Sequence, residues 1–259
     1  MKIACCIWAL AGMETEMLRE ARALDFDWID IQPTHLGALE SRLLAQELGL
    51  RVSCLGASFG MPADAALDSE DNAQQRAAFD HVASGIALAG HLGTESAYIV
   101  PGKDRDERAA ARFSDSLTGL ADLAAGFGVK LAVEHFPGTA LPTASETLEF
   151  IRRADHPNLY LLIDSGHLQI TGEDPASAIL NAGDRLGYMH FDDNDGVSDL
   201  HWALLDGVMT EESLHATLQA LDDIGYEGAL SLELNPGLPN PSRALQKSRD
   251  ILLRTIHRL

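Results

Sequence analysis

Residues 129–164 read VKLAVEHFPGTALPTASETLEFIRRADHPNLYLLID, which is one full unit of a pattern that recurs along the chain. The stretch begins and ends on short apolar runs, Val129–Phe136 and Leu159–Asp164, with the length and composition of buried parallel strands. Between them, Thr143 followed by Glu146 predicts the capped start of an amphipathic helix. The sequence therefore predicts two parallel strands joined by a helix.

The same alternation accounts for the rest of the chain. Eight apolar runs read as strands: Lys2–Trp8, Trp28–Gln32, Arg51–Ala57, Ser96–Pro101, Val129–Phe136, Leu159–Asp164, Leu186–Phe191 and Gly228–Leu234. Helical spacing fills the intervals, over Glu14–Leu24, Leu36–Leu48, Asp71–Leu92, Arg105–Phe127, the segment that Thr143 begins, Pro175–Asn181, Glu211–Ile224 and Ser242–His257. Eight units without a Gly/Ser-rich linker predict a single (β/α)8 TIM barrel domain over residues 1–259. The alternative is a doubly wound open sheet, but no Gly-x-Gly-x-x-Gly follows the first run.

Composition narrows the class of partner. The chain has 259 residues, of which 46% are hydrophobic, and a formal net charge of −20. Such acidity disfavours nucleic acid, and no apolar stretch reaches the roughly 20 residues of a membrane span. Three cysteines without disulfide or metal-site spacing, and an N-terminus without a signal-peptide pattern, favour the cytoplasm. We expect a small-molecule partner, and an acidic surface does not exclude a homo-oligomer.

Titratable side chains stand at the ends of the last four apolar runs. They are Glu134, Asp164, His190 and Glu233. Chemistry in a TIM barrel occurs at the carboxyl ends of the strands. Any one such Glu is ordinarily solvated or ion-paired, but three converging carboxylates and an imidazole need a cation. We expect one divalent ion, Mn²⁺ first, with Co²⁺, Mg²⁺ and Zn²⁺ as alternatives.

Motifs around these positions resemble a known family. Asp164-Ser-Gly-His167, the His190-Phe-Asp-Asp-Asn-Asp-Gly196 element and Leu232-Glu233 are similar to the xylose isomerase-like TIM barrel superfamily, within its sugar phosphate isomerase/epimerase group. The resemblance implies one ion held by Glu134, Asp164, His190 and Glu233. It also implies that Glu134 and Glu233 transfer the proton.

The expected activity is that of a metal-dependent isomerase or epimerase of a sugar, keto-sugar or related polyol. The ion would polarise a carbonyl and stabilise an enediolate, while carboxylates remove and return a carbon-bound proton. A lyase that dehydrates a keto-polyol or cyclic hydroxy acid shares the first step and stays open. A hydrolase like the apurinic-site endonucleases is disfavoured, because the loops after the third and fourth runs lack the His ligands of that branch. A non-catalytic barrel is the remaining alternative.

Four further residues are expected at the substrate. The resemblance places His167, in the loop after the sixth run, against a substrate oxygen. It places His201, in an Asp199-x-His201 motif, beside the substrate or, as in multi-metal relatives, on a second ion. Trp8 ends the first run and is expected to form an apolar wall, and Asp192 is expected to hydrogen-bond the substrate or the metal-site histidine. Several ketose 3-epimerases carry an Arg where this chain has Gly196.

Overall fold

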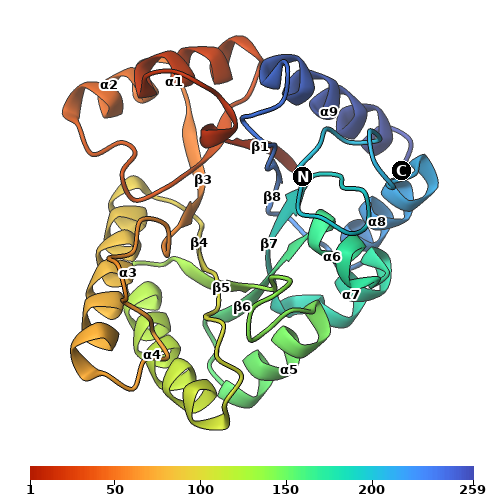
Figure 1. Ribbon diagram of the computed structural model, residues 1–259. Helices are drawn as coiled ribbons and strands as arrows, with labels where there is room; N and C mark the ends of the chain where they lie inside the picture. Colours follow the sequence, from red (N-terminus) through yellow and green to blue (C-terminus); the bar gives the residue numbers. More distant parts are fainter.

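The strands close into a barrel. The computed structural model describes residues 1–259. All eight strands are parallel and each pairs with the next, and β8 returns to β1 (Figure 1). Their bounds are β1 Lys2–Cys6, β2 Trp28–Ile31, β3 Arg51–Gly56, β4 Ser96–Ile99, β5 Lys130–Glu134, β6 Leu159–Asp164, β7 Leu186–Phe191 and β8 Ala229–Leu232. The predicted (β/α)8 TIM barrel is confirmed.

Helices surround this barrel. They are α1 Glu14–Ala23, α2 Leu39–Glu47, α3 Asn72–Leu92, α4 Glu107–Gly126, α5 Ala144–Ala154, α6 Ser165–Thr171, α7 Pro175–Ala182, α8 Glu211–Asp223 and α9 Pro241–Ile256, with short 3₁₀ helices at Ile7–Ala9 and Gly183–Arg185. Thr143 caps α5 as predicted, since its Oγ1 accepts the N–H of Glu146 at 3.1 Å. None of the helices has the length and apolar composition that a membrane span requires.

Two predictions at the strand ends are wrong. The first strand stops at Cys6, and the chain turns through the 3₁₀ helix at Ile7–Ala9, so Trp8 lies beyond the strand. Ile7 and Ala9 are buried in that turn, and apolarity alone does not separate a strand from a buried turn. His167 lies within α6 rather than in a loop, because a seven-residue helix is too short to show a helical period.

The period of two along each strand separates two cores. Outward-facing residues pack against the helices in a large apolar core. Inward-facing residues fill the barrel with a second group of seven: Ala4, Cys54, Tyr98, Ala132, Leu162, Tyr188 and Ala229. Glu134, Asp164 and His190 lie two positions, and Glu233 four positions, after members of this group, so all four also face inward at the carboxyl end. The alternation of side chains along the strands therefore directs the four residues at the strand ends into the same end of the barrel.

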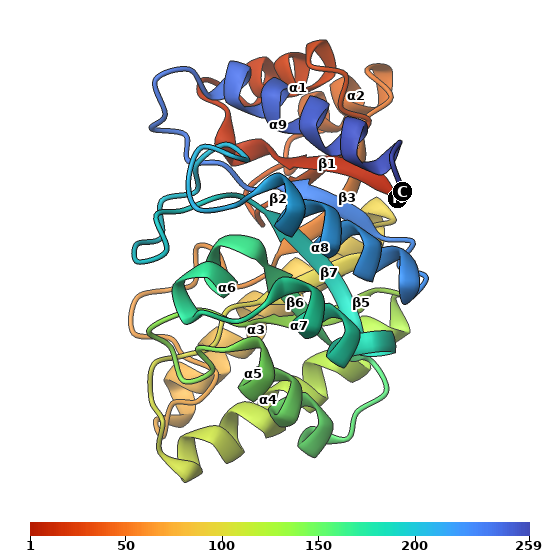
Figure 2. The same cartoon turned by 90° about the vertical axis from the view of Figure 1, so that its right-hand side faces the viewer.

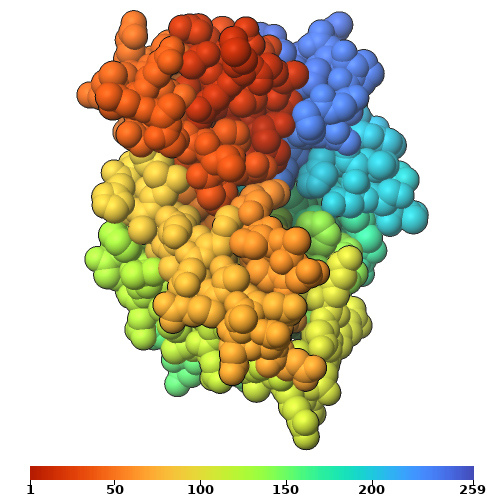
Figure 3. All heavy atoms as spheres, turned by 60° about the vertical axis from the view of Figure 1, so that its left-hand side comes forward, coloured from red at the N-terminus to blue at the C-terminus, as the bar shows by residue number.

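The two chain termini lie together at the end of the barrel opposite the carboxyl ends of the strands. Figure 2 shows both termini on one side and the long segment between β7 and α8 on the other. The N-terminal and C-terminal parts of the chain also lie against each other on the surface (Figure 3). Their contact follows from the pairing of β1 with β8, in which Ala4 is the partner of Ser231 and Cys5 of Leu232.

Candidate metal centre

Four side chains converge at the carboxyl end of the barrel. Glu134 and Asp164 are the last residues of β5 and β6, His190 is the last but one of β7, and Glu233 follows β8 directly. One ligand atom from each lies within 4.8 Å of the others. Asp164 and His190 are fully buried, and Glu134 is 3% exposed. The structure thus brings together the four residues that the sequence singles out.

Unpartnered atoms within this group fit a cation. Nδ1 of His190 lies 2.7 Å from Oε2 of Glu233, 3.6 Å from Oε1 of Glu134 and 4.0 Å from Oδ2 of Asp164. Asp164 Oδ2 is buried without a hydrogen-bond partner, and the contacts of the His190 ring nitrogens are ion pairs with carboxylates rather than aligned hydrogen bonds. Buried polar atoms are rarely left unpaired, and three carboxylate oxygens with one imidazole nitrogen suit a divalent ion. These residues fit the expected metal.

The charges of the group perturb one another. Burial raises the pKa of Glu134 above its ordinary value, against the lowering effect of His190 and His167. Burial would also raise the pKa of Glu233, but the positive charge of His190 outweighs it and lowers that pKa. The pKa of His190 is raised, because the surrounding carboxylates overcome the effect of burial. The centre therefore stabilises positive charge among its carboxylates.

A second group of polar side chains borders the first. Oδ1 of Asp199 lies 3.1 Å from Nε2 of His201 and 3.5 Å from Nε2 of His167. His167 Nδ1 lies 3.8 Å from Oε1 of Glu134, so the two groups are continuous. Burial would lower the pKa of His167, but Asp164 and Asp199 raise it to about 10. Both histidines expected at the substrate thus lie next to the four-residue centre.

Asp192 is held from several sides. Its side chain is fully buried, and Oδ1 accepts the N–H of Gly166 at 2.8 Å. Its Oδ2 lies 2.8 Å from Nδ1 of His201. Burial, followed by the charge of Asp164, raises the pKa of Asp192 to about 7. The contacts of Asp192 are with the protein, and its contact with a substrate stays a prediction.

The segment after β7 is tied by side-chain caps. Oδ1 of Asn194 accepts the N–H groups of Leu200 and His201 at 2.6 and 2.9 Å. These bonds hold His201 at a φ of 48°, a left-handed conformation that residues other than glycine seldom adopt. The segment therefore presents the His201 ring to the centre in a fixed orientation.

Trp8 reaches the centre from the turn after β1. Its Nε1 donates a hydrogen bond of 3.2 Å to Oε1 of Glu233. Its ring also packs on Phe59, with the ring centroids 5.4 Å apart. Trp8 is expected as an apolar wall, and the structure adds a direct bond to a proposed metal ligand.

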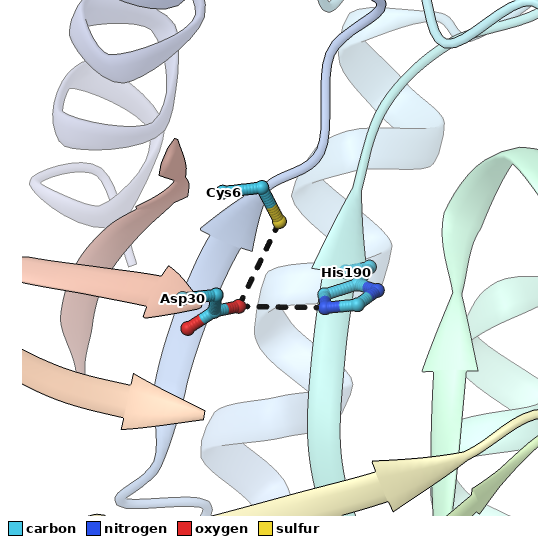
Figure 4. A group of neighbouring side chains, drawn as sticks. All are labelled: Cys6, Asp30 and His190. Carbon is cyan, nitrogen blue, oxygen red and sulfur yellow. Dashed lines mark hydrogen bonds and ion pairs between the residues drawn. The ribbon is translucent and has the colours of Figure 1, made fainter. Parts of the chain in front are cut away.

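Sequence reasoning missed a buried carboxylate behind His190. Asp30 on β2 is fully buried, and its Oδ2 lies 3.4 Å from Nε2 of His190 and 3.8 Å from Sγ of Cys6 (Figure 4). The hydroxyls of Ser53 and Tyr188 each donate to Oδ1 of Asp30 at 2.6 Å. The available signal was a charged residue inside the apolar run Trp-Ile-Asp-Ile at 28–31.

Known proteins share this architecture. An L-ribulose 3-epimerase of Mesorhizobium japonicum is 25% identical over 253 residues, which cover 88% of this chain and 78% of that protein. An inosose dehydratase of Geobacillus thermodenitrificans is 29% identical over 158 residues, 54% of this chain and 53% of that protein. A crystal structure of D-allulose 3-epimerase from Methylomonas sp. in complex with D-allulose superposes with a TM-score of 0.82, at 22% identity, and the match covers 98% and 97% of the two chains.

The 3-epimerase relative, matched over most of both chains, indicates that the chain is an enzyme of the isomerase and epimerase type. A family model described as "Xylose isomerase-like TIM barrel" matches residues 16–255. The resemblance carried by the motifs after β6, β7 and β8 is therefore confirmed, and the chain belongs to the xylose isomerase-like TIM barrel family.

Proposed function

We propose that this enzyme is a divalent-metal-dependent 3-epimerase of a keto-sugar. The observation that carries the proposal is the convergence of Glu134, Asp164, His190 and Glu233, with the buried Asp164 Oδ2 left without a hydrogen-bond partner. An ion bound there would polarise the substrate carbonyl and stabilise the negative charge that develops beside it. The oxygen-rich set with one nitrogen makes Mn²⁺ the proposed ion.

The placement of the two glutamates suits epimerisation. Glu134 enters from β5 and Glu233 from β8, so their carboxylates reach the centre from strands that are not neighbours in the barrel. Inversion at a carbon requires one group that removes a proton from one face and another that returns it to the opposite face. We assign these two roles to Glu134 and Glu233.

The neighbouring residues suit an uncharged substrate. In the ion pairs of the site the cationic partner is always a histidine, namely His167, His190 or His201. A phosphorylated sugar would bring further negative charge to these carboxylates, which have no Lys or Arg among their ion-pair partners. We therefore propose a free keto-sugar, with His167 and His201 on its oxygens and Trp8 against its carbon skeleton. Three free, buried cysteines suit the reducing cytoplasm, the location that we propose.

Metal content and proton exchange test this function together. We expect one ion per chain after dialysis against Mn²⁺, and a much lower content in Glu233→Gln. L-ribulose and D-allulose, the sugars named for the relatives, should incorporate solvent deuterium at carbon 3 in D₂O with wild type only. A protein that binds no ion even with added Mn²⁺ would exclude the proposal, and three zinc ions per chain would favour a hydrolase.

Dehydration is the second candidate. The inosose dehydratase match, over about half of the chain, favours it, and both reactions begin by removing a proton beside a carbonyl. Mass spectrometry separates the two, because an epimer has the mass of its substrate and a dehydration product is lighter by one water. Loss of water from an inosose, with no epimerisation of ketoses, would replace our proposal.

A further inference from the structure

The two ring nitrogens of His190 face different surroundings. Nδ1 faces the carboxylates of the metal centre, with Oε2 of Glu233 at 2.7 Å. Nε2 faces the barrel interior, where Oδ2 of Asp30 lies 3.4 Å away, an ion-pair contact that is not aligned as a hydrogen bond (Figure 4). His190 and Asp30 are both fully buried and come from β7 and β2, which are not paired in the barrel. The carboxylate therefore meets the ring from across the barrel lumen.

Asp30 is itself fixed in orientation. Its Oδ1 accepts hydrogen bonds from Tyr188 Oη and Ser53 Oγ, both at 2.6 Å. Ser53 has a second acceptor, the Ile29 carbonyl at 3.1 Å, whereas the Tyr188 hydroxyl has only Asp30. Since Oδ1 is occupied by these donors, Oδ2 is the oxygen left to face His190. A buried carboxylate with this arrangement is an oriented acceptor.

We propose that Asp30 is a positioning residue for the metal centre. When the ion is bound, its Oδ2 would accept the Nε2 proton of His190, which would fix the tautomer in which Nδ1 carries a lone pair toward the ion. Metal-binding histidines generally donate their other N–H to a partner of this kind, and its loss weakens metal affinity by about 10- to 100-fold. The inference rests on the proposed metal-dependent function.

A second metal site formed by these residues is less consistent with the contacts. Cys6, Asp30 and His190 also offer three ligand atoms within 4.8 Å, so they form a candidate second metal site. However, burial raises the pKa of the Cys6 thiol well above its ordinary value, so it stays protonated and donates toward Oδ2. A second ion would also have to compete with the two hydroxyls that already occupy Asp30.

Asp30→Asn tests the proposal with almost no change in shape. The Tyr188 hydroxyl needs an acceptor, so it should hold the amide oxygen of Asn at the Oδ1 position and turn the NH₂ toward Nε2 of His190. That NH₂ can only donate, which favours the tautomer with the proton on Nδ1, where it blocks ligation. We expect Mn²⁺, titrated without substrate and followed by the electron paramagnetic resonance of the free ion, to bind 10- to 100-fold more weakly.

A second substitution should reverse this effect. In Asp30→Asn/Tyr188→Phe the hydroxyl that orients the amide is absent, and Ser53 can accept from the NH₂ while donating to the Ile29 carbonyl. The amide oxygen is then free to face Nε2, so Mn²⁺ affinity should recover to within a few-fold of Tyr188→Phe alone. If Asp30 acted only by supporting the fold, the double variant would bind Mn²⁺ no more tightly than Asp30→Asn.

Several outcomes would overturn the inference without touching the proposed function. One is wild-type Mn²⁺ affinity in Asp30→Asn, and another is a double variant as weak as Asp30→Asn. Two ions per wild-type chain, with one lost in Cys6→Ala, would assign the atoms to a second metal instead. A wild type that binds no Mn²⁺ would instead contradict the proposed function itself.

Wild type offers a measurement that needs no substitution. In ¹⁵N-histidine-labelled, Mg²⁺-loaded protein, the Nε2 proton of His190 should be shifted downfield and exchange slowly with solvent. Thermal unfolding of the variants in EDTA checks that each is folded. If Asp30→Asn does not fold, the wild-type resonance still tests the proposal. An Nε2 proton of His190 that is not shifted downfield, or that exchanges rapidly with solvent, would exclude a hydrogen bond to Asp30.

Discussion

Nε1 of Trp8 donates to Oε1 of Glu233 across the junction between β1 and β8, with 3.2 Å between the two atoms. Pairing of β1 with β8 closes the barrel, so this bond links the first and last strand–helix units at the metal centre. It also restricts the rotation of a carboxylate that we assign to proton transfer.

Trp8→Phe should therefore lower the rate more than it lowers stability. A hydrogen bond to a charged group contributes about 1.5–3 kcal/mol, and partial exposure places this one at the lower end, so we expect kcat to fall about tenfold. Steady-state kinetics on a ketose that the enzyme epimerises would measure the change.

Trp28→Phe is the matched control for this substitution. Trp28 lies at the start of β2, with the Lys2 Nζ 4.5 Å from its ring centroid, at the end of the barrel away from the centre. We expect unchanged kcat in this variant. Equal losses in the two variants would show that the Trp8 bond has no specific role.

Two buried tyrosines provide opposite predictions for stability. Tyr98 and Tyr188 both lie inside the barrel, with ring centroids 5.2 and 5.6 Å from that of His190. The hydroxyl of Tyr98 has no hydrogen-bond partner, whereas that of Tyr188 donates to Asp30. Tyr98→Phe should raise the free energy of unfolding by about 1 kcal/mol, and Tyr188→Phe should lower it by about 1.5–3 kcal/mol. Urea denaturation in EDTA measures both, and shifts of the same sign would contradict the reasoning.

The ends of the strands show how much the sequence can predict. Leu159–Asp164 and Leu186–Phe191 were predicted with the bounds that the structure has. Local apolarity defines such runs. Because successive side chains along a strand alternate between its two faces, the positions of Asp164 and His190 then point inward. The convergence of the candidate ligands was thus predictable once the strands were known to close into a barrel.

Asp30 was not predictable in the same way. Its partner His190 is 160 positions away, and the contact depends on how the strands are staggered around the barrel, as in the pairing of Cys6 with Asp30. Local sequence carries no information on that stagger. A single Asp within a short apolar run is also compatible with the edge of a solvated strand, so only the closed barrel shows that it is buried.

Gly166 lies where a side chain would displace Asp192. A Cβ at this position would overlap Asp192 Oδ1 and Asn194 Nδ2. Gly166→Ala should therefore destabilise the protein by about 1–3 kcal/mol and, by moving Asp192 and the His201 that it holds, reduce kcat. Gly126→Ala, with open space around the added atom at the end of α4, should instead stabilise by about 0.5–1 kcal/mol. Urea denaturation and kinetics on both variants would test this, and a harmless Gly166→Ala would mean that Asp192 can move without loss.

Mn²⁺ should stabilise the fold through the four-residue centre. A ligand that binds only the native state at 100 times its Kd contributes about 2.7 kcal/mol, which for a chain of this size raises Tm by about 5–10 °C. Thermal unfolding with Mn²⁺ and with EDTA measures the difference.

The same measurement on two variants assigns the stabilisation to the centre. Glu233→Gln should lose most of the Mn²⁺-dependent rise in Tm, because one of its three carboxylates is gone. Glu227→Gln makes the same change of charge at an exposed residue before β8, and should keep the full rise. Because both variants lower the negative charge of the protein equally, a general attraction of Mn²⁺ to an acidic surface would affect them alike. Equal losses would therefore place the bound ion outside the centre, while a loss confined to Glu233→Gln would place it among the strand-end carboxylates.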